Sequence, residues 1–333
     1  MDTVGTIDRH DQLSVLADEH RRAILRRLMC GPSTLSRLGR EFDKHPAWIR
    51  HHLKRLEAVG LAEPAGEQKV RNYTEKFYRA SAGAYAIHLL IGPDTGDRAP
   101  LMVLGSHDFA LELLVANANV TDGHREIVPA AIGSLDGLVA LRQGLADIAG
   151  CHLFDAEADE YNIPYLRHLF PDRRMAGLTL AHREQGLMTA PGNPLKIRGV
   201  EDLARPGLVL ANRNPGSGTR VWLDRKLHDL GIDPTAIVGY DRPFRTHTEA
   251  ALAIAAGEAD AGLGIRAAAE ESGLGFVTLF HERYDLIFDA DRLEDPALAA
   301  FLDRLATRAF RTGVREIRGY ETDHTGDALR LDG

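Results

Sequence analysis

The segment 212–227 carries the residues with the clearest chemistry in the sequence, beginning Asn-Arg-Asn-Pro-Gly-Ser-Gly-Thr-Arg. Apolar residues before it (207–211) predict a buried strand, and apolar residues at helical spacing after it predict an amphipathic helix. A glycine turn between a strand and a helix brings backbone N–H groups, the hydroxyls of Ser217 and Thr219 and the positive helix end to one point. Such a point binds anions. A plain helix cap is the alternative, because Ser and Thr are good cap residues.

The tetrapeptide Gly-Ser-x-Asp occurs twice, each time between an expected strand and an expected helix, and its copies contain Ser106 and Ser134. The strands are expected at 101–104 and 127–131, and the helices at 109–118 and 137–145. This alternation predicts a parallel α/β sheet. Ligands of such sheets bind at the carboxyl ends of the strands, so the three serine turns predict one shared site.

A second repeat indicates that the α/β part has two similar halves. Residues 143–150 resemble residues 256–263, and each copy has the pattern of a helix end, a glycine turn and a strand of small residues. One copy falls in each half of the stretch after residue 100. We therefore expect two lobes with a cleft between them.

Composition is typical of a globular protein with more than one domain. The 333 residues are 44% hydrophobic and 26% charged, which allows two or three domains with full-sized cores. Cys30 and Cys151 stand far apart, which predicts neither a disulfide framework nor a cysteine metal site and fits a reducing compartment. The acidic start has no apolar signal-peptide core, and no run of about 18 apolar residues occurs. We expect a cytoplasmic protein.

The net charge of −8 is divided unequally along the chain. Residues 1–80 hold 15 Lys and Arg against 11 Asp and Glu, whereas the remainder holds 25 against 37. A basic N-terminal part followed by an acidic remainder indicates contact with nucleic acid through residues 1–80 only.

Residues 1–80 have the pattern of a winged helix-turn-helix, in which a helix pair is followed by a β-hairpin. The expected elements are helices at 11–17 and 19–29, a short helix capped by Ser33, a helix at 47–58 and a wing strand at 69–78. Asp18 is expected to cap the second helix, and Pro46 to open the helix 47–58.

The helix 47–58 is expected to have one basic face and one apolar face, the latter formed by Ile49, Leu53 and Leu56. A basic face neutralises phosphates while the first helical turn reaches base edges. A merely solvated helix face is the alternative. The predicted DNA contacts are Ser33, Trp48, Arg50, His51, Lys54 and Arg55, with Lys69, Arg71 and Tyr73 from the wing.

The segments 16–25 and 51–61 resemble the ArsR-type winged-helix regulators, and the resemblance covers about residues 10–80. It implies that this domain binds DNA. Metal-sensing members of that family need cysteine or histidine ligand sets, whereas Cys30 stands alone and His51 and His52 point to different sides of a helix. We therefore expect no metal site and a sensor elsewhere in the chain.

Residues 101–326 resemble the two-lobed type 2 periplasmic-binding-protein fold, and within it the molybdate/tungstate-binding branch found fused to DNA-binding domains. The segments that carry the resemblance are 133–138, 151–155, 160–162, 183–187, 191–194, 212–220, 246–248, 282–286 and 319–326. The resemblance implies that hydroxyls and backbone N–H groups hold a tetrahedral oxyanion.

On that pattern, hydroxyl donors come from both lobes. The implied ligand residues are Ser106, Ser134, Arg183, Ser217, Gly218, Thr219, Arg220, His247 and Thr248. The arginines stay open between ligand contact and a salt bridge that closes the lobes. Asn162 and Tyr161 stay open between lining the cleft and packing a loop, and His107 and His152 are interpreted as local hydrogen-bonding residues. Serine-rich helix ends also suit sulfate or phosphate.

Motifs of enzymes are missing from the sequence, which has no Gly-x-Ser-x-Gly elbow, no Walker loop and no His-Glu-x-x-His spacing. Cys151 and His152 are neighbours on an expected strand, so their side chains point to opposite faces and cannot act as nucleophile and base. We expect no catalysis, no metal and no cofactor.

The sequence thus predicts an α+β winged-helix domain over 1–80, a linker over 81–99 and a two-lobed α/β domain over 100–333. The expected function is a transcriptional regulator that binds double-stranded DNA and senses a small oxyanion, with molybdate or tungstate favoured. A homodimer is expected, because one winged helix covers too little DNA for tight specific binding. The alternatives are an organic effector, such as an amino acid or a pterin, and a cytoplasmic oxyanion binding or storage protein.

Overall fold

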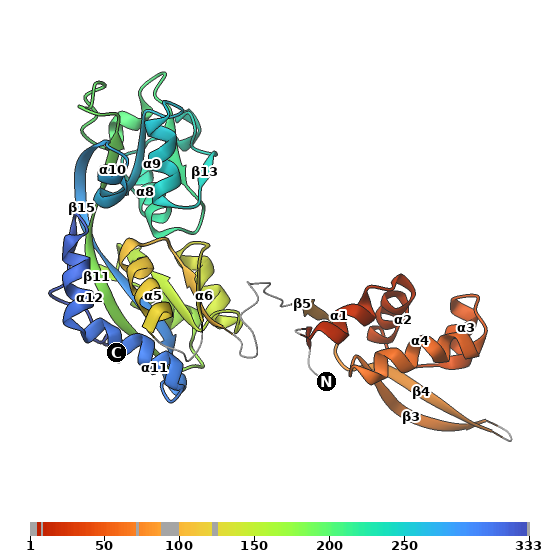
Figure 1. Cartoon of the computed structure of the whole chain (residues 1–333). Helices are drawn as coiled ribbons and strands as arrows, with labels where there is room; N and C mark the ends of the chain where they lie inside the picture. The colour runs from red at the N-terminus through yellow and green to blue at the C-terminus, as the bar shows by residue number, and fades with distance from the viewer. Residues whose placement is uncertain (1–4, 8, 71–72, 88–99, 122–125, 332–333) are drawn as a thin grey trace. The chain divides into compact units, whose positions relative to one another are not determined.

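The computed structural model describes residues 5–7, 9–70, 73–87, 100–121 and 126–331 (Figure 1). The chain divides into two compact units, Met1–Ile91 and Gly92–Gly333. Each unit has hydrophobic clusters of its own, so each is described by itself. Within the residues just given, no helix combines the length and apolar character needed to cross a bilayer.

The first unit combines helices with a small antiparallel sheet. Its elements are β1 (Gly5–Ile7), α1 (His10–Leu16), α2 (Glu19–Met29), β2 (Ser33–Thr34), α3 (Leu35–Glu41), α4 (Pro46–Ala58), β3 (Ala62–Val70), β4 (Tyr73–Ala80) and β5 (Tyr85–Ile87). The sheet has the order β2-β4-β3, and β1 pairs with β5 in parallel. Buried residues of α2, α3 and α4 form the core against this sheet, which confirms the predicted winged helix-turn-helix pattern.

Local caps explain where these helices start. The Asp18 carboxylate accepts the N–H of Arg21, as predicted, and Pro46 occupies the first turn of α4. The predicted cap of α3 was wrong by one residue: Thr34 accepts the N–H of Arg37, whereas Ser33 is fully buried in β2. Ser33 is buried because it pairs with Tyr78 of β4.

The first unit extends beyond the boundary predicted at residue 80. The Tyr85 hydroxyl donates to the carbonyl of Leu61 at 2.8 Å and lies 2.7 Å from the Ser81 hydroxyl. Together with the β1–β5 pairing, these bonds attach 81–87 to the first unit. The predicted linker 81–99 therefore begins too early, and its remaining residues, 88–99, lie outside the described part.

The second unit is an α/β domain built on one mixed sheet. Its elements are β6 (Leu101–Gly105), α5 (Phe109–Thr121), β7 (Ile127–Ala131), α6 (Ser134–Arg142), β8 (Ile148–Cys151), β9 (Phe154–Asp155), β10 (Glu160–Tyr161), α7 (Ile163–Leu169), β11 (Met175–Thr189), β12 (Leu210–Arg213), α8 (Gly218–Asp229), β13 (Pro243–Phe244), α9 (His247–Ala255), β14 (Ala261–Ile265), α10 (Arg266–Glu271), β15 (Gly275–Asp289), α11 (Pro296–Asp303), α12 (Arg308–Glu316) and β16 (Tyr320–Glu321). The main sheet runs β13-β12-β14-β11-β15-β8-β6-β7.

Two long strands divide this sheet into two lobes. β11 and β15 have 15 residues each and pair antiparallel from Met175↔Asp289 to Thr189↔Gly275. β15 joins β8, β6 and β7 on one side, and β11 joins β14, β12 and β13 on the other. Figure 1 shows the long strands running from one lobe into the other. The predicted two-lobed architecture is therefore confirmed.

The lobes repeat one local pattern, as the sequence predicted. α6 is followed by Gly144 and β8, and α9 is followed by Gly257 and β14. Both glycines have φ of 73°, the left-handed conformation that ends a helix. The predicted strand at 207–211 is instead β12, which begins later because Gly207, with φ of 82°, lies in a turn.

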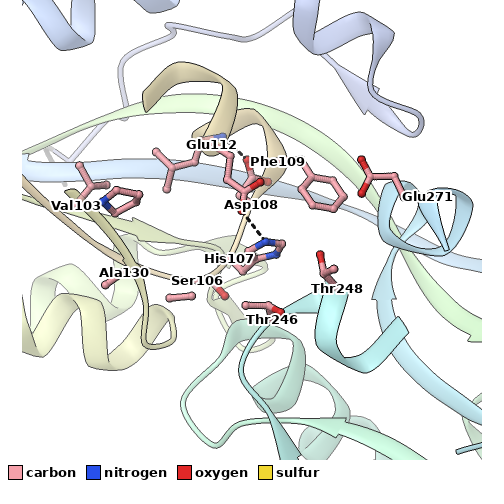
Figure 2. Close-up of a pocket in the computed structure, with 13 residues that line it drawn as sticks. Val103, Ser106, His107, Asp108, Phe109, Glu112, Ala130, Thr246, Thr248 and Glu271 are labelled. Atoms are coloured by element: carbon pink, nitrogen blue, oxygen red, sulfur yellow. Dashed lines mark hydrogen bonds and ion pairs between the residues drawn. The ribbon is translucent and has the colours of Figure 1, made fainter. Parts of the chain in front are cut away.

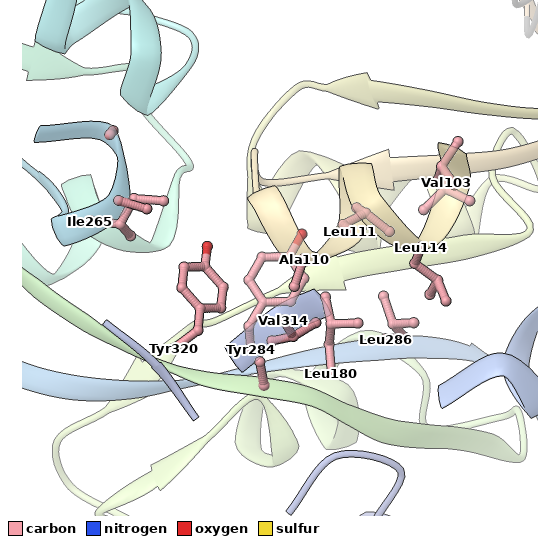
Figure 3. Packing of buried hydrophobic residues seen from close by; sticks show 14 of the residues in the cluster. Val103, Ala110, Leu111, Leu114, Leu180, Ile265, Tyr284, Leu286, Val314 and Tyr320 are labelled. Carbon is pink, nitrogen blue, oxygen red and sulfur yellow. The ribbon is translucent and has the colours of Figure 1, made fainter. Parts of the chain in front are cut away.

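The largest core cluster surrounds the long strands. Buried side chains of α5 and α12 pack with Leu180 of β11 and with Tyr284 and Leu286 of β15, and Figure 3 shows them gathered around these strands. In the second lobe, Trp222 of α8 stacks on Phe280 of β15, with ring centroids 4.3 Å apart. The long strands are thus held by side chains along much of their length.

Candidate functional site

The N-termini of four helices meet where the lobes face each other. α5 and α6 begin in the first lobe, and α8 and α9 begin in the second. The N–H of Leu135 in α6 donates to the carbonyl of Gly216 at 3.0 Å, and the rings of His107 and His247 lie 5.9 Å apart. Helix N-termini carry positive potential and free N–H groups, so their meeting point favours an anion.

Alternation along the long strands places four polar side chains on one face. Arg183 and Gln185 alternate on β11, and Glu282 and Tyr284 alternate on β15. Arg183 donates through Nε to Glu282 Oε1 and through Nη1 to Asp108 Oδ2, both at 2.6 Å. All three ionic side chains are at most 3% exposed, so the strand crossing holds a buried ion-pair cluster.

The Glu282 carboxylate is the centre of a hydrogen-bond network that reaches both lobes. It accepts from His152 Nδ1 at 2.9 Å and from Gln185 Nε2 at 2.8 Å. His152 Nε2 lies 3.0 Å from the Ser106 hydroxyl in the first lobe. Gln185 Nε2 also donates to Thr219 Oγ1 of α8, in the second lobe, at 3.1 Å. The network therefore links the end of β6 to the start of α8 through the long strands.

Burial and charge set the protonation of this network. Burial alone would raise the pKa of Glu282, but His152 and Arg183 outweigh it and hold that pKa at about 2. Burial lowers the pKa of His152 despite the Glu282 carboxylate. Burial, with Arg213 and Arg183 nearby, also lowers the pKa of His247 well below its usual value. At neutral pH, Glu282 is an anion and both histidines are neutral.

Arg213 is a second buried cation in this region. It donates to the carbonyls of Arg245 and Phe244 at 2.8 and 3.3 Å, and to His247 Nδ1 at 2.9 Å. Burial, with Arg183 as the next cause, lowers its pKa to about 9. Its hydrogen bonds within the described residues run to neutral groups, so an anion nearby would stabilise it.

Several buried polar atoms around this point lack a hydrogen-bond partner among the described residues. They are His107 Nδ1, Arg183 Nη2, Gln185 Oε1 and His247 Nε2. An unsatisfied buried polar atom destabilises a fold by roughly 1–3 kcal/mol, so folded proteins seldom keep several together without a use. These atoms come from both lobes and from the strands that join them, as expected for a ligand site.

A cavity of about 500 Å³ opens beside Ser106, between the start of α5 and the start of α9 (Figure 2). Its lining residues are Val103, Ser106, His107, Asp108, Phe109, Leu111, Glu112, Pro129, Ala130, Ala131, Thr246, Thr248 and Glu271. Ligand pockets of roughly 300–1,000 Å³ are typical of small-molecule sites. The cavity receives residues from both lobes.

Most of the predicted ligand residues lie at this meeting point. Ser106, Ser134, Thr219 and His247 are buried there, and Thr248 lines the cavity. Ser134 stands at the start of α6, which begins there rather than at the predicted residue 137, and its hydroxyl accepts the N–H of His152 at 3.3 Å.

Gly218 allows the lobes to approach each other. A Cβ atom at this position would lie 2.5 Å from the carbonyl oxygen of His152. Only a glycine therefore lets the start of α8 rest directly on the end of β8.

Two predicted ligand residues have other partners. The Ser217 hydroxyl accepts the N–H of Arg220 at 3.2 Å and donates to the carbonyl of Asn214 at 2.9 Å. Arg220 binds Asp224 at 2.7 Å, and its guanidinium lies 3.9 Å from the Tyr240 ring centroid. Ser217 thus caps α8, the alternative left open by the sequence, and Arg220 holds the start of α8. Direct contact of either residue with a ligand stays a prediction.

The structure also gives partners to two residues whose roles the sequence left open. Arg183 forms the salt bridges of the strand crossing, although its Nη2 atom remains without a partner there. Asn162 bonds the N–H of Leu153 and the carbonyl of Cys151, so it packs a loop.

Sequence reasoning missed the centre of the network. It interpreted His152 as a local residue and assigned no role to Gln185, Glu282 or Arg213. The available signal was a short polar stretch in the middle of each long strand, in which Arg183 and Gln185, and Glu282 and Tyr284, are spaced by two. Such spacing marks one face of a strand.

The predicted DNA-binding face is formed by α4. Arg50, His51, Lys54 and Arg55 are exposed, whereas the apolar residues of the opposite side are buried. The Trp48 ring contacts the buried His52 ring at a centroid distance of 4.1 Å, and Trp48 is half-buried.

The other predicted contacts have different outcomes. Ser33 cannot reach DNA in this structure, because its side chain is fully buried in β2; this prediction was wrong. Lys69 and Tyr73 lie on the wing strands β3 and β4, but their side chains, and Arg71 as a whole, lie outside the described residues.

Comparison with known proteins identifies both parts of the chain. Residues 117–306 match the model of the PBP superfamily domain, and residues 16–65 match a helix-turn-helix domain model. The chain is 35% identical over 197 residues to the uncharacterized protein YvgK of Bacillus subtilis, covering 59% of this chain and 63% of YvgK. The chain thus spans less than two thirds of the length of that relative.

Two further comparisons show similarity over part of the chain. A Clostridium pasteurianum protein encoded in the 5′ region of a 2Fe-2S ferredoxin gene is 29% identical over 107 residues, which are 32% of this chain and 95% of that protein. A solved Clostridium perfringens protein, assigned as a phosphate ABC transporter substrate-binding protein and holding phosphate, shares the fold at 14% identity and a TM-score of 0.50, over 66% of this chain and 97% of that one. The chain belongs to the PBP superfamily, and a helix-turn-helix domain precedes its PBP domain.

Proposed function

We propose that the chain is a ligand-responsive transcriptional regulator that binds DNA through its first unit and a small oxyanion between the lobes of its second unit. The combination of a helix-turn-helix domain with a PBP domain supports the general part of this proposal. The exposed basic face of α4 would contact DNA phosphates.

One observation carries the choice of an anion. Arg183 Nη2 and His247 Nε2 are buried and have no partner within the described part of the chain, close to the meeting point of four helix N-termini. Arg213 adds a buried positive charge whose hydrogen bonds run to neutral groups. A small oxyanion would supply the acceptors that these groups lack.

Two candidate classes of anion have support. The sequence resemblance favours molybdate or tungstate, and the Clostridium perfringens protein with the same fold holds phosphate. A second candidate is an organic anion, because Val103, Phe109 and Leu111 give the cavity an apolar wall that an inorganic oxyanion would not use.

The proposed response follows from the site's position between the lobes. A ligand that contacts residues of both lobes stabilises the closed arrangement over an open one. In a homodimer, this change would alter the spacing of the two DNA-binding helices and hence the affinity for a palindromic operator. Binding of ligand and of DNA would then be coupled.

Isothermal titration calorimetry of the full chain with molybdate, tungstate, sulfate and phosphate tests the proposal. We expect heat of binding with at least one of them, and at least about tenfold weaker binding in a His247→Ala variant, which loses a buried donor. Ser272→Ala, at the end of α10, is the matched control and should bind as the wild type does. If none of the four anions produces heat or raises the melting temperature, the oxyanion function is excluded and the organic candidate takes its place.

A further inference from the structure

The network around Glu282 fixes which groups of the site donate and which accept hydrogen bonds. Glu282 is ionised and can only accept, so His152 Nδ1, Arg183 Nε and Gln185 Nε2 all turn their protons toward it. His152 and Gln185 are neutral and point their donor atoms at this carboxylate. An acceptor atom is therefore left on the far side of each.

The first such acceptor is the Ser106 hydroxyl oxygen. The neutral His152 ring carries one proton, which lies on Nδ1, so Nε2 has a lone pair and accepts the Ser106 proton at 3.0 Å. Ser106 therefore faces the cavity with its oxygen lone pairs and has no free proton to give.

The second acceptor is Gln185 Oε1. The amide is oriented by its Nε2 group, which donates to Glu282 and to Thr219, because the opposite orientation would place an oxygen against the carboxylate. Oε1 is left buried without a partner among the described residues. It can be satisfied only by a group that donates a hydrogen bond.

Two donors are also left over in this region. Arg213 Nη1 donates to His247 Nδ1, so the single proton of the neutral His247 ring lies on Nε2. His247 Nε2 and Arg183 Nη2 are both buried, and neither has a hydrogen-bond partner among the described residues. Among the side chains of this network and of its neighbour His247, two donors and two acceptors are thus left for a ligand, whereas a fully deprotonated oxyanion offers acceptors alone.

We propose that this site selects a small anion that carries its own hydrogen-bond donor, such as monohydrogen phosphate or a small hydroxy acid. A fully deprotonated oxyanion such as sulfate or molybdate then binds only together with one proton taken from solvent by His152. With both ring nitrogens protonated, His152 donates to Glu282 and to Ser106, and the Ser106 proton turns to the ligand. This inference rests on the proposed oxyanion function and reverses the ligand order favoured by the sequence resemblance.

The surroundings of His152 allow this protonation step. Glu282 accepts from it, and the Tyr284 ring stacks against it at 5.7 Å. Ser106 lies at its Nε2 atom, and Gly218 at the start of α8 lies beside the ring. Arg183 and Arg213 oppose the added charge, and the negative charge of the ligand offsets them.

Calorimetry with inorganic phosphate, sulfate and molybdate distinguishes an anion that brings its own proton from one that binds together with a proton from solvent. At a mildly alkaline pH, phosphate keeps one proton whereas sulfate and molybdate have none, so we expect phosphate to bind at least about tenfold more tightly. Titrations in buffers of different ionisation enthalpy should show uptake of about one proton per sulfate or molybdate and of none per phosphate.

A pair of variants tests the assignment to Ser106. Ser106→Ala removes one acceptor and the need to protonate His152, so the preference for phosphate should shrink at least about threefold and proton uptake with molybdate should disappear. Ser272→Ala should keep the wild-type preference and uptake. Binding of sulfate or molybdate without proton uptake, or at the affinity of phosphate, would overturn this inference and leave the oxyanion function standing. Absence of heat with every anion would overturn both.

Discussion

Arg183 of β11 and Glu282 of β15 face each other directly, with Nε and Oε1 2.6 Å apart, where the long strands pass from one lobe to the other. On one side of this point β15 continues alongside β8, and on the other β11 continues alongside β14. The pair therefore belongs to both lobes. Because it is also the base of the proposed ligand site, the residues that join the lobes are those that set the chemistry between them.

Removal of Arg183 should strongly destabilise the second unit. Arg183→Met leaves the carboxylates of Glu282 and Asp108 without their shared cation, and loss of one partner of a buried ion pair lowers the free energy of unfolding by about 3–5 kcal/mol. Urea unfolding followed by circular dichroism measures this. The control is Arg225→Met, which breaks an exposed pair with Asp229 and should change the free energy by no more than about 1 kcal/mol. Equal effects in both variants would contradict the role of burial.

Stability of the second unit should fall as the pH drops below 6.5, the usual pKa of histidine. The folded-state pKa values of His152 and His247 are lowered, so the unfolded chain takes up protons that the folded chain refuses. Each histidine then contributes a slope of about 1.4 kcal/mol per pH unit, and the stability is fully present above that pH.

Urea titrations at a series of pH values check this, and His247→Gln should remove one of the two contributions. A slope identical to that of the wild type would exclude His247 as a source. Glu282, whose pKa is lowered from 4.5 to about 2, acts in a separate and more acidic range, where its contribution is lost as the pH falls.

Gly218→Ala should prevent the lobes from closing around a ligand. The added Cβ would lie 2.5 Å from the His152 carbonyl oxygen and 2.6 Å from His152 Nδ1, so α8 must move away from β8. We expect ligand affinity to fall at least about tenfold in calorimetry. Lys226→Ala on the same helix, at an exposed position, should leave the affinity unchanged. Full affinity in the glycine variant would show that this contact is not needed for binding.

Loss of two basic residues of α4 should weaken DNA binding without affecting the sensor. Arg50→Ala combined with Lys54→Ala removes two exposed cations, so the affinity for the chain's own promoter should fall. The plot of log K against the logarithm of the salt concentration should also become less steep, by about two in slope. Gel shifts at several salt concentrations measure both, with Lys226→Ala as the control. An unchanged gel shift would remove α4 from the DNA interface.

Much of the fold could be predicted because its signals are local. Asp18 and Pro46 mark helix starts through chemistry that acts within one turn, and Gly144 and Gly257 mark helix ends in the same way. Alternating strands and helices predicted the α/β unit, and its repeated pattern predicted the two lobes.

The centre of the site could not be predicted, because its contacts join residues far apart in sequence. Ser106, His152 and Glu282 are brought together only by the order of strands in the sheet. Ser217 could not be assigned for a different, local reason. A serine before a helix has the same sequence pattern whether it binds a ligand or caps the helix. Its bonds to Arg220 and Asn214 show the cap, and its contact with a ligand stays a prediction.

The positions of the two tryptophans have a practical consequence. Trp48 lies on α4 against His52, and Trp222 lies on α8 against Phe280, so each unit carries one indole. Because the two rings have different neighbours, replacing either one by phenylalanine leaves a fluorophore that reports on a single unit. Emission from Trp222 would follow the closing of the lobes, and emission from Trp48 would follow the arrival of DNA, so parallel titrations of the two single-tryptophan variants could time the proposed signal from sensor to operator.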